Sequence, residues 1–174
     1  MNTMKVLKFL LVSLFMAFSI TVTASVISTQ AAQTGTVNAT VTAQNIAVGV
    51  SSGTVTYGVV GTGSSKATTA TGTNQSQFAT NLGNVNETFN IVGQTAGGWA
   101  LGPAAGDETY FHRWCTTTCD GSPTWWSLST GYTTLATGVA ASGVQEFDLM
   151  VGTPITTTDY SSHSVDVVVQ ATAQ

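Results

Sequence analysis

Residues 146–151 read EFDLMV, so that Phe147, Leu149 and Val151 alternate with Glu146 and other more polar neighbours. Successive side chains on a β-strand point to opposite faces, whereas a helix repeats every 3.6 residues. A period of two therefore predicts a β-strand here, with one apolar face turned towards a core.

The same alternation recurs along most of the chain after residue 36, and no helical period of useful length accompanies it. Gly and Asn clusters, such as Gly61-Thr62-Gly63 and Gly97-Gly98, separate the short segments and mark turns. This pattern predicts an all-β fold, a single immunoglobulin-like β-sandwich of about eight to ten short strands preceded by a signal-peptide helix. The expected strands are 37–43, 46–50, 54–60, 67–71, 88–91, 109–115, 125–128, 132–136 and 165–171.

The first 24 residues have the order of a secretory signal peptide. Lys5 and Lys8 precede an apolar run over 9–20, and small residues around 24 and again around 31 offer two cleavage sites. We therefore expect a signal at 1–24, or up to 31, an N-terminal strand or arm at 25–45 and a sandwich at 46–174. The protein is expected to be secreted or at the cell surface, without stable membrane insertion after processing, and an uncleaved anchor is the alternative.

Charge is scarce. Removing the signal takes away two of the four cations and leaves Lys66 and Arg113 against eight acidic residues, so the net charge changes from −4 to 2 − 8 = −6. Nucleic-acid binding needs clustered cations that neutralise phosphates, and two scattered ones exclude it as an expected function.

The N-terminal segment changes its apolar face. Val37, Ala39, Val41 and Ala43 occupy odd positions, but the apolar residues of 46–50 occupy even ones. A flat strand cannot do this, because a shift by one residue turns every side chain to the other face. A bulge at Gln44-Asn45, or a strand that crosses between sheets, would explain the change. The alternative is that 35–43 is a separate arm that completes a neighbouring subunit by β-strand addition.

Cys115 and Cys119 are four residues apart, and in an exported protein this spacing predicts a local disulfide. With His112 and His163, the two cysteines would supply the four ligands that zinc needs. These four residues are spaced more loosely than the ligand pairs of tetrahedral zinc sites, so we expect no metal and no cofactor.

Aromatic residues gather in the middle of the chain. Trp99, Trp114, Trp125 and Trp126 would form a glycan-binding platform if exposed, although we expect at least two of them in the core. We do not expect the protein to be an enzyme, because the sequence shows no nucleophile with an adjacent base. Asp159 and His163 could pair across a turn.

The stretch 54–93 resembles bacterial secreted immunoglobulin-like surface domains, in its Tyr57-Gly58 pair, the corner at 81–84 (NLGN) and the central Phe89. The overall layout is similar to the TasA/camelysin group of fibre subunits. The motifs at 99–101 (WAL) and 126–128 (WSL) resemble those of WxL wall-binding domains, which place their second copy nearer the C-terminus. These resemblances imply a surface β-sandwich and report no activity.

We therefore expect a non-enzymatic extracellular structural protein, a subunit of a filament or layer whose partner is another copy of itself. No anchoring motif was found in the chain, and this favours assembly as the means of retention. The alternative is a secreted carbohydrate-binding or adhesin module that uses the tryptophans to bind cell-wall or surface glycans.

Overall fold

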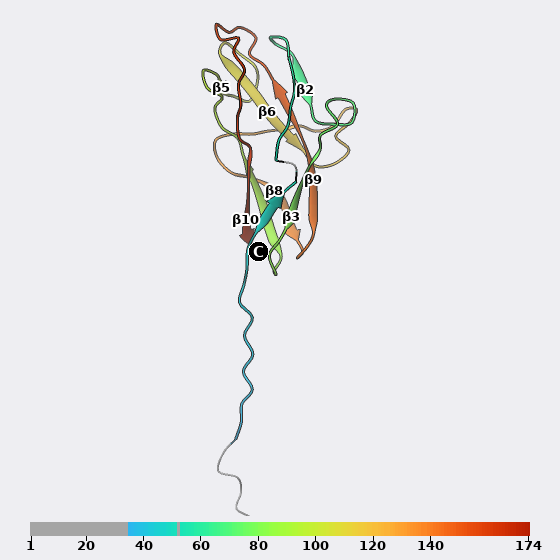
Figure 1. Ribbon diagram of the computed structural model, residues 1–174, viewed down its shortest axis with the longest axis vertical. Coiled ribbons are helices and arrows are strands. Elements are labelled where there is room, and N and C mark those ends of the chain that lie inside the picture. Colours follow the sequence, from blue (N-terminus) through green and yellow to red (C-terminus); the bar gives the residue numbers. More distant parts are fainter. Residues whose placement is uncertain (1–34, 52) are drawn as a thin grey trace, which may run out of the picture. The chain divides into compact units, whose positions relative to one another are not determined.

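The computed structural model describes residues 35–51 and 53–174, so the predicted signal peptide lies outside the described residues. The chain divides into two units, Met1–Val41 and Thr42–Gln174. The second unit is an all-β sandwich, which confirms the predicted fold class, and its ten strands are distributed over two sheets (Figure 1).

The larger sheet has seven strands. β1 (Val48–Val50), β3 (Gln77–Asn81), β9 (Val144–Gly152), β6 (Thr109–Cys115) and β5 (Ala100–Leu101) follow one another across it. β2 (Ser65–Ala67) pairs with the C-terminal end of β9, and β7 (Trp126–Ser127) pairs with β6. All of these pairs are antiparallel except that of β5 with β6.

The smaller sheet consists of β10 (Val168–Ala173), β4 (Glu87–Val92) and β8 (Thr133–Val139), all antiparallel. Apolar side chains from both sheets meet between them, as their alternation predicts, and enclose the core. Its buried members are Ala79, Phe89, Ile91, Trp114, Leu128, Leu135, Phe147 and Leu149.

Several sequence expectations need correction. Residues 37–43 and 54–60 form no strand, and residues 165–167 precede β10 instead of belonging to it. The strand expected at 67–71 ends at Ala67, because the chain turns over residues 68–73. β3 was not predicted, because its inward side chains at Gln77 and Asn81 are polar while Phe78 points outward.

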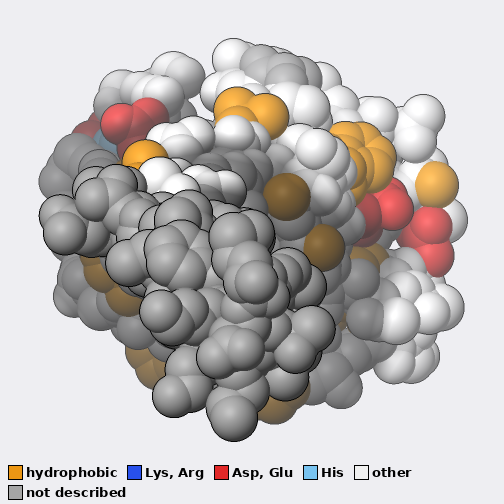
Figure 2. Space-filling view, turned by 90° about the horizontal axis from the view of Figure 1, so that it is seen from below, with side chains coloured by type: hydrophobic (Ala, Val, Ile, Leu, Met, Phe, Trp, Pro, Cys, Tyr) orange, Lys and Arg blue, Asp and Glu red, His pale blue; other side chains and the backbone are white. Residues whose placement is uncertain are grey.

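Figure 2 shows one face of the molecule, on which white polar groups cover most of the described surface. Hydrophobic side chains (orange) are scattered over this face, and the charged side chains seen on it are acidic (red). Among the described residues, no helix is long and apolar enough to cross a bilayer.

Candidate functional site

Two segments without strand partners flank an open groove in the sandwich domain. Residues 53–60 follow β1, and residues 161–167 lead into β10. Within the described part of the chain, no backbone-to-backbone hydrogen bond involves residues 54–60 or 161–167. Side chains bond some of these groups: Gln75 accepts the N–H of Thr56, Lys66 donates to the carbonyl of Tyr57, and Asp159 accepts the N–H of Ser161. Neither segment has a neighbouring strand, so their other backbone groups resemble those of the edge strands of a sheet.

The side chains of both segments alternate as strand residues would. Val55 and Tyr57 are partly buried between exposed neighbours, and Val165 and Val167 repeat this pattern on the other side. These apolar faces line two cavities of about 200 and 430 Å³ that share Tyr57, His112, His163 and Val165. Because the cavities share these walls, we treat them as one groove.

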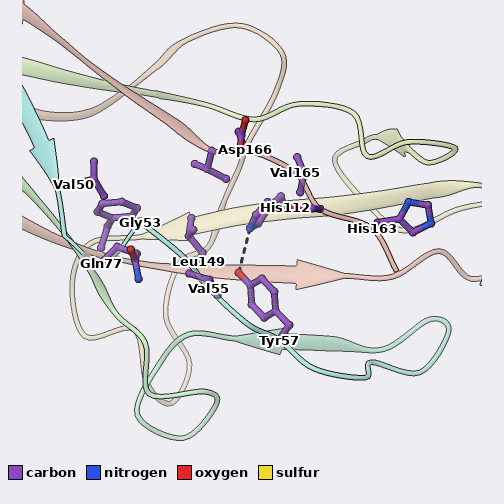
Figure 3. A pocket seen from close by; sticks show the side chains of 13 residues that line it. Val50, Gly53, Val55, Tyr57, Gln77, His112, Leu149, His163, Val165 and Asp166 are labelled. Carbon is purple, nitrogen blue, oxygen red and sulfur yellow. Dashed lines mark hydrogen bonds between the residues drawn. The ribbon is translucent and has the colours of Figure 1, made fainter. Parts of the chain in front are cut away.

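The floor of the groove comes from the larger sheet: β6 supplies Tyr110 and His112, and β9 supplies Phe147, Leu149 and Val151. Figure 3 shows Tyr57 and His112 pointing towards each other across the floor of the smaller cavity. The hydroxyl of Tyr57 lies 3.2 Å from Nε2 of His112.

The groups on this floor are uncharged near neutral pH. His112 is only 3% exposed, and burial lowers its pKa to about 4. Burial, and to a lesser degree the charge of Asp148, raises the pKa of Tyr57, while burial raises that of Tyr110 to about 12. Nδ1 of His112 is buried and has no hydrogen-bond partner among the described residues. The floor thus carries no charge near neutral pH, although it contains this one unpaired ring nitrogen.

The chain before β1 is held on one edge by the corner at 81–84. The N–H of Leu82 donates to the Ala47 carbonyl at 2.8 Å, and the N–H of Asn84 donates to the Asn45 carbonyl at 3.1 Å. Together with the pairing of Gly49 with Thr80, these bonds continue one antiparallel register back to Asn45. The structure therefore shows no bulge at Asn45.

This unbroken register has a consequence for the arm. Val48 packs against the core and Val50, which is partly exposed, lines the groove, so the even-numbered side chains are on the core side of the sheet. Continued towards the N-terminus, the same alternation would turn Val37, Ala39, Val41 and Ala43 to the opposite face. All four are exposed, Val37 by 92% and Val41 by 97%.

The predicted disulfide between Cys115 and Cys119 is confirmed, with Cα atoms 5.8 Å apart. Because both thiols are used, neither can ligate a metal, and His112 is turned to Tyr57 instead. Among the described residues, no group of three or more His, Cys, Asp or Glu side chains is arranged to hold a metal ion.

The four tryptophans do not share one surface. Trp114 is buried and stacks at 6.3 Å on Trp126, which is 57% exposed, while Trp99 and Trp125 are half-buried. Trp99 lines the larger cavity, where its indole N–H donates to Thr157 and its ring lies 4.1 Å from that of His163. Only Trp114 belongs to the buried core, where we had expected at least two tryptophans.

The acidic residues near the larger cavity are used in local hydrogen bonds. Glu108 accepts hydrogen bonds from the hydroxyl of Thr157 and from the N–H and hydroxyl of Thr158, which lowers its pKa. Asp159 accepts a hydrogen bond from the N–H of Ser161 and lies 3.4 Å from Nε2 of His163, as the predicted pairing requires. These contacts hold the loop before the 161–167 segment in place.

Comparisons of this chain with protein-family profiles, with curated proteins and with solved structures found no match.

Proposed function

We propose that this protein is a non-enzymatic extracellular structural subunit that assembles with copies of itself by β-strand addition. The arm, residues 35–43, is the donor, and the groove between residues 53–60 and 161–167 of a neighbouring copy receives it. Export is proposed from the signal-like N-terminus.

The observation that carries this proposal is the unbroken register through Asn45. Because no bulge restores the alternation, an arm that continued this register would turn its apolar side chains away from the core of its own sheet. They are small, and they alternate with Asn and Thr, as suits a strand with one side against an apolar floor and the other in solvent.

The two edges of the groove matter energetically. Ordering the seven residues 37–43 of the arm costs about 7–14 kcal/mol in backbone entropy. Burying two Val and two Ala side chains returns about 6 kcal/mol, at about 0.8 kcal/mol per carbon. Pairing with one edge would add only three or four hydrogen bonds of about 1 kcal/mol each, and pairing with both edges would add about twice that number. Insertion between both edges is therefore favoured over addition to one.

The second candidate function is glycan binding, and the exposure of Trp126 favours it. Its ring is supported by Trp114 beneath it, as an aromatic platform for a sugar would be. The larger cavity offers a second aromatic surface, with Trp99, Tyr110 and Tyr160 beside several hydroxyls. Glycan binding at these surfaces would not depend on residues 35–43.

Negative-stain electron microscopy of the mature protein, beside a version that starts at Gln44, tests the proposal. Filaments from the full mature chain and monomers from the shortened one are expected. Folded monomers from both would refute strand donation, and binding of glycans to either version would then support the second function.

A further inference from the structure

The side chain of Asn84 binds the backbone on both sides of Gln44. Its Nδ2 donates to the carbonyl of Ala43 at 2.8 Å, and its Oδ1 accepts the N–H of Asn45 at 2.8 Å. A carbonyl and an N–H that flank one residue point to the same side only where the chain is extended. The carboxamide therefore takes the place of the N–H and C=O that one residue of a parallel partner strand would supply.

The corner that carries Asn84 is itself firmly held. The amide of Asn81, which is buried, donates to the carbonyls of Val85 and Val139, and its oxygen accepts the N–H of Gly83. Gly83 lies so close to the carbonyl of Asn45 that a Cβ would collide with it. Only glycine fits there, and the close approach brings Asn84 within reach of the residues before β1.

A second group continues this row of contacts. Oε1 of Glu87, whose side chain is fully buried, accepts the N–H of Ala47 at 2.9 Å. Every edge-facing polar group from the Ala43 carbonyl to the Ala47 carbonyl is therefore bonded, by Asn84, Leu82 or Glu87. The corner at 81–84, together with Glu87, therefore holds the backbone of residues 43–47 in an extended conformation.

We propose that Asn84 is the positioning residue that decides between donation of the arm to a neighbour and insertion of the arm into its own groove. This inference rests on the proposed function. The groove begins near Val50 and Gly53, which lie C-terminal to the residues 43–47 held by the corner. An arm that returned to its own groove would have to reverse direction before β1, and a reversal at 43–45 breaks both bonds to Asn84. Holding Gln44 extended therefore disfavours insertion in cis and leaves the arm for another copy.

The test compares Asn84→Ala with the wild type and with Asn86→Ala, a matched control at an exposed asparagine two residues away. The mature versions are separated into polymer and monomer by size-exclusion chromatography with light scattering. The monomer fraction is then treated with elastase, which cleaves after small apolar residues such as those of the arm. Asn84→Asp is a second variant, which keeps an acceptor for the Asn45 N–H and loses the donor to the Ala43 carbonyl.

We expect the monomer fraction of Asn84→Ala to rise at least several-fold, with its arm resistant to elastase because it fills its own groove. Asn84→Asp should shift in the same direction, and Asn86→Ala should match the wild type. The inference is overturned if Asn84→Ala polymerises like the wild type, or if its monomers have an elastase-sensitive arm. Failure of the proposed function looks different, since then the version that starts at Gln44 and the full mature chain would behave alike, either both monomeric or both polymeric.

Discussion

Acid should destabilise the folded domain through His112. The imidazole is buried on the groove floor, and its pKa is lowered from 6.5 to about 4. In the unfolded chain the same group takes up a proton as the pH falls below 6.5, while the folded state stays neutral until about pH 4. The contribution of His112 is therefore complete above pH 6.5 and is lost progressively between 6.5 and about 4.

The magnitude follows from the size of the shift. Each pKa unit corresponds to about 1.4 kcal/mol, so the free energy of unfolding should fall by about 2 kcal/mol between pH 7 and 5. By pH 4 the loss should reach about 3 kcal/mol. The carboxylates with lowered pKa values, Glu108, Asp120 and Asp159, lose their contributions only below about pH 4.5, so the interval from 7 to 5 isolates histidine.

Urea denaturation of the version that starts at Gln44 measures this effect without interference from assembly. His112→Phe should lose about 2 kcal/mol of the pH dependence between 7 and 5, whatever its stability at neutral pH. Tyr57→Phe is the matched control, because it removes the hydrogen bond to Nε2 but leaves a buried histidine to titrate. Parallel pH profiles for the original version and His112→Phe would show that this argument from burial is wrong.

Three further outcomes are expected. Replacing both Cys115 and Cys119 by Ser should lower the free energy of unfolding by about 2 kcal/mol, the entropy of a five-residue loop, measured as a shift of the urea midpoint. Val41→Asp should abolish filaments in electron microscopy, whereas Thr40→Asp on the polar face should retain them, and equal effects would contradict insertion by face. Gly83→Ala should destabilise the domain by at least about 1 kcal/mol in thermal unfolding, because its Cβ meets a backbone carbonyl, and an unchanged melting temperature would contradict the close approach.

The sequence predicted the strands whose inward residues are apolar. Residues 109–115 form β6 as expected, and the alternation around Phe89 and Phe147 marks β4 and β9. β3 escaped prediction because its buried Asn81 is stabilised by the carbonyls of Val85 and Val139, and no local pattern reveals the second of these partners.

The residues of the groove illustrate a different limit. Alternation at Val55 and Tyr57 predicts a strand, and the two side chains are indeed partly buried between exposed neighbours. The period of the apolar residues predicts which side chains are buried, however, and does not show whether the backbone is hydrogen-bonded to a neighbouring strand. The lack of a partner strand therefore became visible only in the structure, whereas the short spacing of Cys115 and Cys119 was enough to predict their bond.

One groove and one arm on each chain would also determine the architecture of an assembly. Because the joined surfaces differ, every contact is head-to-tail, and the resulting polymer is unbranched, open-ended and polar. Its two ends are chemically distinct, one with an empty groove and the other with a free arm. An armless copy could bind only at the end that offers a free arm and would terminate growth there, so the ratio of armless to complete subunits would control filament length.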